Sequence, residues 1–267
     1  TTSVGSGTWL EVVGLPTATT TMELRARNDL SIQDKLTFLT GGAISGAGVN
    51  ARIRTLSDLA RVSIGDGATL LSKGAIDMSA RGSGSIVQKI NVDTYGAGTV
   101  TTGEAFVEVL PVNEVNIGSA AITAYGDLKI SAGRDTNFDA DDYHVEARYD
   151  GIAGSVVPID RVDGKAYLVQ ENRISIGTGA YLKTARQALL HAEKLSDNDV
   201  IGKAKITSWV SGVSDGLLAL TGGGADQYNG HLLQEAHGTI TNNGTVETGI
   251  TRHQTLTLSG WNPTTGV

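Results

Sequence analysis

Val62-Ser-Ile-Gly-Asp-Gly-Ala68 recurs twice further along the chain, and this recurrence limits the architectures that the sequence can adopt. The second copy is Val115-Asn-Ile-Gly-Ser-Ala-Ala121 and the third is Ile174-Ser-Ile-Gly-Thr-Gly-Ala180. The interval from Val62 to Val115 is only slightly shorter than the interval from Val115 to Ile174. Self-similarity at a nearly fixed period is the signature of a repeat protein.

Apolar and polar residues alternate in the segment that follows each copy. In the first of these segments Ile76, Met78 and Ala80 enclose Asp77 and Ser79. A period of two residues is typical of a strand with one buried face. The residues that we expect to face the interior are the large apolar ones of this pattern: Ile64, Ile76, Met78, Ile117, Ile130, Ile176 and Leu190.

The segment after the third copy, residues 184–195, is rich in good helix formers, and propensity alone favours a helix there. However, Gly67 is as far from Ala80 in the sequence as Gly179 is from Ala192. The third copy therefore matches the first without a gap, and its apolar residues fall on the same positions. Since context can override propensity, we predict a strand.

These patterns predict an all-β chain that folds as a right-handed parallel β-helix, a solenoid whose hand follows the usual crossover preference. Each unit of the repeat holds several short apolar segments separated by Gly, Asp and Asn. This predicts two coils per unit, each of roughly 25–30 residues. Asn242-Asn-Gly244 is interpreted as a corner of the coil rather than as a hairpin turn. The 35 glycines and the 5% aromatic content fit a narrow aliphatic interior.

The domain organisation predicted from these patterns has two parts. Residues 1–25 form an N-terminal lead-in or partial cap, and residues 26–267 form the β-helix repeats. The sequence begins at Thr1 without an initiator Met, and its end offers no obvious cap. We therefore expect a piece of a longer chain, whose flanking segments are its first partners.

Composition bears on several classes of partner. The net charge is −7 and there is no basic cluster, so nucleic acid is not an expected partner. No run of 18 apolar residues occurs, so the chain is not expected to span a membrane. The absence of Cys excludes disulfides and thiolate metal sites.

The repeated phrase, the Gly-separated Ile/Ala strands and the segment Thr239-Ile-Thr-Asn-Asn-Gly-Thr-Val-Glu247 resemble the large bacterial exoproteins of the filamentous-haemagglutinin type. The resemblance covers roughly residues 26–258. It implies a giant, repetitive surface or secreted adhesin with a right-handed parallel β-helix. Residues 1–25 show no match to the secretion domain of that family, so the resemblance implies an internal or C-terminal slice of the fibre.

One acidic segment carries the only candidate chemistry. Asp135, Asp139, Asp141 and Asp142 lie close together in sequence, with His144 after them. Carboxylate oxygens could hold Ca²⁺ or serve acid–base chemistry. The sequence favours a solvated loop at a corner, where Asp and Asn are preferred for backbone reasons, with a calcium site as the alternative. No other cofactor is expected.

Aromatic side chains offer a second hint of binding. Six tyrosines and one tryptophan lie within the repeats: Tyr95, Tyr125, Tyr143, Tyr149, Tyr167, Tyr181 and Trp209. Stacked on one outer face they would form a platform for carbohydrate. Their offsets from the repeated phrase differ between copies, which favours local packing instead.

The function expected from the sequence is that of a non-catalytic structural segment of a large extracellular bacterial adhesin or surface fibre. It would lie outside the cell or on the cell surface and mediate attachment to a host or partner cell through a glycan or a protein. The alternative is a polysaccharide-active β-helix enzyme, a lyase or hydrolase. Against it, Gly230-His231 is followed by Leu232, so the Gly-His-Gly of polygalacturonases is missing. An autotransporter passenger is a third possibility.

Overall fold

The computed structural model describes residues 1–13, 20–135, 142–193, 205–214, 226–229, 231–249 and 256–259. Within these ranges every regular element is a β-strand and no helix occurs. The strands form one sheet of 11 strands and a second sheet of five. All pairs are parallel except one, between β12 and β13. The chain is therefore all-β, as the sequence predicts.

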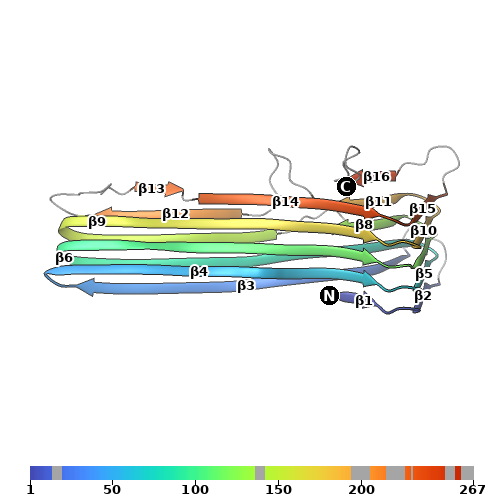
Figure 1. Cartoon of the computed structure of the whole chain (residues 1–267), viewed down its shortest axis with the longest axis horizontal. Helices are drawn as coiled ribbons and strands as arrows, with labels where there is room; N and C mark the ends of the chain where they lie inside the picture. The colour runs from blue at the N-terminus through green and yellow to red at the C-terminus, as the bar shows by residue number, and fades with distance from the viewer. Residues whose placement is uncertain are drawn as a thin grey trace.

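The strands differ greatly in length (Figure 1). The four long ones are β3 (Thr21–Gly41), β4 (Ile44–Ile64), β6 (Ala75–Ile117) and β9 (Asp142–Ile176). The shorter members of the large sheet are β1 (Thr2–Val4), β8 (Leu128–Ala132), β11 (Ala188–Ala192), β12 (Lys205–Ser214), β13 (Asp226–Asn229), β14 (His231–Asn242) and β16 (Leu256–Ser259). The five-stranded sheet contains β2 (Trp9–Val12), β5 (Thr69–Ser72), β7 (Ala121–Ala124), β10 (Tyr181–Thr184) and β15 (Thr245–Thr248).

The path of one repeat explains these lengths. The chain runs out along β3, bends at residues 42–43, returns along β4, turns a corner at residues 65–68 and enters β5. The single strand β6 makes the next outward and return passes, because Gly41 pairs with Tyr95 while Ile44 pairs with Gly98. Figure 1 shows the short strands β2, β5, β10 and β15 together at one end and the bends at the other, and β7 pairs between β5 and β10.

Equivalent positions of successive repeats are direct neighbours in the large sheet. Val62 pairs with Val115, Val115 with Ile174 and Ile174 with Ile240. The prediction of two coils per unit is therefore wrong, because one unit adds a single strand to each ladder. The chain uses its residues on long outward and return passes instead of on two narrow turns, and the expected short strands are fused into long ones.

The segment after the third copy forms a strand, as the period of the repeat predicts. Ala188, Leu190 and Ala192 form β11 and pair with Leu128, Ile130 and Ala132, so the strand is confirmed against the helix favoured by propensity. Residues 242–244 are a corner as predicted, because the strand before them belongs to the large sheet and the strand after them to the small one.

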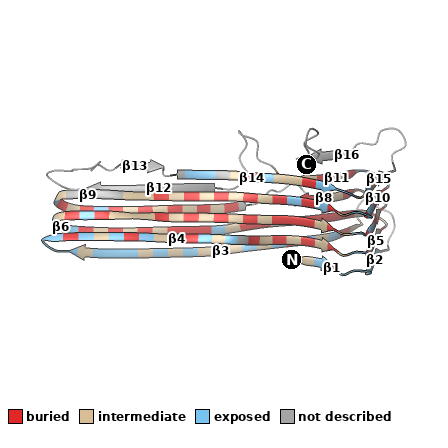
Figure 2. Cartoon of the chain, viewed as in Figure 1, coloured by how far each residue is buried: buried red, intermediate tan, exposed pale blue. Residues whose placement is uncertain are grey.

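Two apolar clusters fill the interior, and all seven residues predicted to face inward are buried in the cluster beside the short strands. The second cluster lies further along the long strands and contains Ile86, Ile90, Val107, Tyr149 and Leu168, among others. Figure 2 shows that burial is greatest on the inner strands of the stack and lower on β3 and β14. This follows from the stacking, because only an inner strand has a neighbour on both sides.

A layer of buried polar groups separates the two apolar clusters. The Asn113 amide donates to Asn172 Oδ1 at 2.8 Å, and the Asn172 amide donates to the Glu193 carbonyl at 3.0 Å. In the same layer the fully buried Tyr143 donates from its hydroxyl to Asp58 Oδ2 at 3.0 Å, and Asn28 donates to the other oxygen of Asp58. Buried polar groups of this kind are stable only when hydrogen-bonded, so the layer fixes the relative position of three repeats.

Asp58 gives this layer a dependence on pH. Burial raises the pKa of Asp58 above the ordinary 3.8, with the hydrogen bond from Tyr143 opposing the rise and the charge of Asp29 adding to it. The folded state thus holds this proton more tightly than the unfolded chain. The contribution of Asp58 to stability therefore falls as pH rises from 3.8 through the folded-state pKa.

Between about pH 4 and pH 7 the free energy of unfolding should decrease less with rising pH in Asp58→Asn than in the unmodified chain, because the variant lacks this titrating group. Urea denaturation at a series of pH values measures this. Asp29→Asn is the contrasting control. The hydrogen bond from Ser83 lowers the pKa of Asp29, so the contribution of Asp29 to stability increases as pH rises, whereas that of Asp58 decreases. The same pH dependence in the Asp58 variant and the unmodified chain would contradict the assignment.

Candidate functional site

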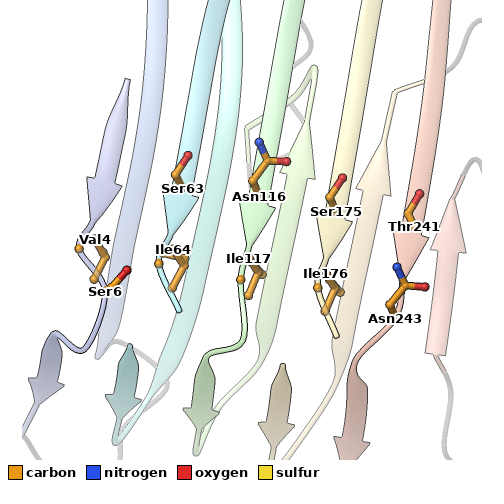
Figure 3. A pocket seen from close by; sticks show the side chains of 14 residues that line it. Val4, Ser6, Ser63, Ile64, Asn116, Ile117, Ser175, Ile176, Thr241 and Asn243 are labelled. Carbon is orange, nitrogen blue, oxygen red and sulfur yellow. The ribbon is translucent and has the colours of Figure 1, made fainter. Parts of the chain in front are cut away.

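A row of polar side chains crosses the return strands just before the corner that leads to the short sheet. Pairing places Ser63 of β4 beside Asn116 of β6, Asn116 beside Ser175 of β9, and Ser175 beside Thr241 of β14. These residues line a shallow groove of about 590 Å³, which we call the corner groove (Figure 3). In Figure 3 the four side chains follow one another across four neighbouring strands, with the isoleucines of the next position beside them.

Glycine in the repeated phrase makes the corner possible. The glycines Gly65, Gly118 and Gly177 lie one above another, and the Gly118 and Gly177 amides donate to the Ile64 and Ile117 carbonyls at 2.8 and 2.7 Å. A Cβ on Gly65 would lie 2.6 Å from the amide nitrogen of the preceding corner, and one on Gly118 would lie 2.3 Å from a neighbouring carboxylate oxygen. Glycine lets these corners stack closely, and the column continues in Asn243, whose amide donates to the Ile176 carbonyl at 2.9 Å.

The second corner is one residue shorter than the other two. Thr69 pairs with Ala121 and Ala121 with Tyr181, so Ala120 rather than Ala121 is the equivalent of Ala68. The longer corners end on glycines with positive φ, Gly67 at 70° and Gly179 at 83°. The groove residues of the three strands remain aligned despite this difference, because the missing residue of the second corner lies after the stacked glycines.

A ladder of charges lies on the same return strands, two residues before the polar row. Arg61 of β4 donates through Nε to Glu114 Oε2 at 2.7 Å. Arg173 of β9 approaches the other oxygen of Glu114 at 3.5 Å and Glu171 at 2.9 Å. Asn116 also donates to Glu114, at 3.3 Å. The two cations beside the groove are thus already paired with carboxylates.

Exposed aromatic residues lie beyond the corner, at the first residues of two of the short strands. Trp9 of β2 and Tyr181 of β10 stand in one column with Thr69 and Ala121, and their side chains are 63% and 38% exposed. The Tyr181 hydroxyl donates to Glu247 Oε2 at 2.5 Å, and this bond raises the pKa of Tyr181. Along the chain the polar row is therefore preceded by paired charges and followed, after the corner, by a column that contains two aromatic rings.

The acidic segment predicted from sequence is described only in part. Asp135 lies 3.5 Å from the guanidinium of Arg81, and Asp142 opens β9 opposite Ser83. Asp139 and Asp141 lie outside the described residues. The described ranges contain no group of three or more side chains arranged to hold a metal ion. The calcium site remains a prediction.

A cluster that sequence reasoning missed lies on the other long face. The Arg134 guanidinium binds both oxygens of Glu193, one of them at 2.6 Å, and His191 Nε2 lies 2.8 Å from the same carboxylate. Burial alone would raise the pKa of Glu193, but the hydrogen bonds from His191 and Arg134 outweigh it and lower the pKa. The signal was the period itself, because Arg134 and Glu193 stand exactly one repeat apart in the sequence, as Val115 and Ile174 do.

The aromatic residues of the repeats lie in different environments, and Tyr167 packs edge-on against Phe106 with ring centroids 5.5 Å apart. Tyr143 and Tyr149 are fully buried and belong to the second apolar cluster. Tyr95, Tyr125 and Tyr181 are exposed, and Lys73 places its ammonium 4.6 Å from the ring centroid of Tyr125. Among the exposed tyrosines of the described ranges, Tyr181 stands in the same column as Trp9, just after the corner.

No protein-family model, curated protein or solved structure matches this chain. None of the described segments forms an apolar helix of the length needed to cross a membrane.

Proposed function

We propose that this chain is a non-catalytic structural segment of a large extracellular bacterial adhesin or surface fibre, built as a right-handed parallel β-helix. It holds flanking segments of a longer chain in line and mediates attachment to a surface or to another cell. The observation that carries the proposal is the constant register of successive repeats. The column Val4, Ile64, Ile117 and Ile176 keeps an aliphatic residue followed by glycine on four successive strands, and Asn242 continues it on β14.

Constant register supports a role as a spacer for a physical reason. Each repeat pairs with the repeats before and after it, so adding a repeat lengthens the body in one direction without rearranging the rest. The buried polar layer and the ladder of ion pairs repeat in the same direction and hold neighbouring repeats in line. A row of stacked corners along such a body also presents a continuous surface for attachment.

The test is adhesion measured beside turnover. Beads coated with the chain should adhere to bacterial or host cell surfaces more than beads coated with an unrelated β-protein do. The chain should release no reducing ends or unsaturated sugars from a panel of polyuronides. Turnover that is abolished by Asp141→Ala with Asp142→Ala would replace this proposal with the polysaccharide-active enzyme. Equal adhesion of coated and control beads would also count against it.

A further inference from the structure

We propose that the corner groove binds a neutral linear polysaccharide that lies across the return strands, along the direction in which the repeats stack. This inference rests on the proposed function and names the ligand class of the attachment surface. Four features support it: the spacing of the polar row, the unsatisfied hydroxyls in that row, the exposed rings just after the corner and the balance of charge.

The spacing of the polar row suits a sugar chain. Neighbouring strands of a sheet lie about 4.7–4.9 Å apart, so Ser63, Asn116, Ser175 and Thr241 offer one polar group at each such step. An extended polysaccharide presents hydroxyls at a comparable interval, once per pyranose ring. A ligand lying along the row can therefore keep the same contact at every strand.

The hydroxyls in the row are available to a ligand. Within the described residues Ser63, Ser175 and Thr241 make no side-chain hydrogen bond, and Ser175 and Thr241 are exposed. A hydroxyl both donates and accepts, and so does every hydroxyl of a sugar. A row of serine and threonine matches such a ligand at each position, whereas a row of carboxylates or ammonium groups would match only half of its bonds.

The exposed rings add an apolar surface. Trp9 and Tyr181 lie three strand steps apart in one column, a distance of about 14 Å, which spans several pyranose rings. Both rings have an apolar body and a polar tip, a combination suited to the apolar face and hydroxyl rim of a sugar. The column of the two rings runs in the same stacking direction as the polar row, so the rings can keep a linear ligand aligned with that row.

The charges at the groove favour a neutral ligand over an anionic one. Arg61 and Arg173 are paired with Glu114, and Asp66 on the corner accepts the Ser119 amide at 2.7 Å. Both arginines are therefore already neutralised by neighbouring carboxylates. The chain as a whole carries a net charge of −7, so a polyuronide would meet repulsion without gaining an unpaired cation.

The experiment uses the full chain with cellohexaose and mannohexaose as neutral probes and oligogalacturonate as the anionic one. We expect calorimetry to detect binding of at least one neutral probe and none of the anionic probe. Tyr181→Ala should weaken that binding by about fivefold to tenfold, the loss expected for one aromatic contact. The combined variant Asn116→Ala with Ser175→Ala should weaken it by a similar factor.

Tyr125→Ala is the matched control. Tyr125 is an exposed tyrosine that follows the last residue of β7, at the opposite end of the short strands from Tyr181. It should leave binding unchanged. An unchanged melting temperature in all variants shows that the loss of binding does not come from unfolding. Equal losses in the Tyr125 and Tyr181 variants, or preference for oligogalacturonate, would overturn the assignment.

Adhesion by the same variants separates the two proposals. Beads coated with the Tyr181 variant should lose adhesion together with binding of the neutral probe. Adhesion that persists in every groove variant, with no binding of either neutral probe, would refute the polysaccharide and leave the adhesin standing. Absence of adhesion by the unmodified chain, with the neutral probe still bound, would refute the adhesin and leave the groove assignment standing.

Discussion

Replacing Gly82 by alanine should destabilise the fold by about 2–5 kcal/mol, the combined cost of overpacking and of a disturbed buried hydrogen bond. A Cβ on Gly82 would lie 2.0 Å from the hydroxyl oxygen of Tyr143. That hydroxyl cannot simply move, because Tyr143 is fully buried and donates to Asp58 at 3.0 Å. The shift in the midpoint of urea denaturation measures the loss.

A double-mutant cycle isolates the cause. Tyr143→Phe removes the atom that the new methyl group would strike, and the next nearest atom of the ring lies 3.1 Å away. We therefore expect Gly82→Ala to cost less in the Tyr143→Phe background than in the unmodified chain, by about 1 kcal/mol or more, within the usual range of coupling between residues in contact. Additive effects of the two substitutions would show that the clash with the hydroxyl is not the reason for glycine at this position.

Ile130→Ala should cost about 2–5 kcal/mol of unfolding free energy, as large-to-small substitutions in tight cores do. Ile130 stands between Met78 and Leu190 in one column, and all three side chains are fully buried. A cavity at this position therefore removes contacts with the repeats on both sides, so the loss falls toward the upper end of that range.

Lys129→Ala is the control for Ile130→Ala. Lys129 is the adjacent residue of β8 and points to the opposite face of the sheet, where it is only partly buried. Its removal should change stability by no more than about 0.5 kcal/mol. If both substitutions had the same effect on the denaturation midpoint, the assignment of inner and outer faces in β8 would be wrong.

The period of the repeat predicted the strands near the corners well. Ala188, Leu190 and Ala192 were assigned to a strand against their propensity because the first and third copies align without a gap, and the structure confirms that strand. The alternation of apolar residues also identified the buried face. Both inferences depend on local spacing, which the sequence states directly.

The size of a coil could not be read in the same way. A period of this length fits either two narrow turns or one long excursion, and the residues at the far bend do not distinguish them. Gly96-Ala-Gly98 is one of several Gly-rich segments in the repeat, yet only this segment forms the far bend. Pairing between Val62 and Val115 decides the question, and pairing is a property of the folded chain.

The sequence shows the polar residues of the corner groove as a repeated pattern, but it does not show that they form a groove. The second residue of the repeated phrase is Ser63, Asn116 or Ser175, polar in every copy, but alternation alone explains a polar residue at that position. The buried polar layer left no such signal. Asp58 and Tyr143 are far apart in the sequence and meet because a strand irregularity between Thr55 and Asp58 shifts the register of β4.

The long separation between paired strands also determines how the chain folds. Rungs of the two sheets join residues that are a whole repeat apart in the sequence, as between Ile76 and Leu128 or between Ala188 and Leu256. Closing a loop of this size loses chain entropy before any contact compensates for it, and topologies dominated by such contacts fold slowly. The first pair of repeats is therefore the slow step. Each later repeat adds to an edge that is already aligned, so folding spreads outward from wherever that first pair forms.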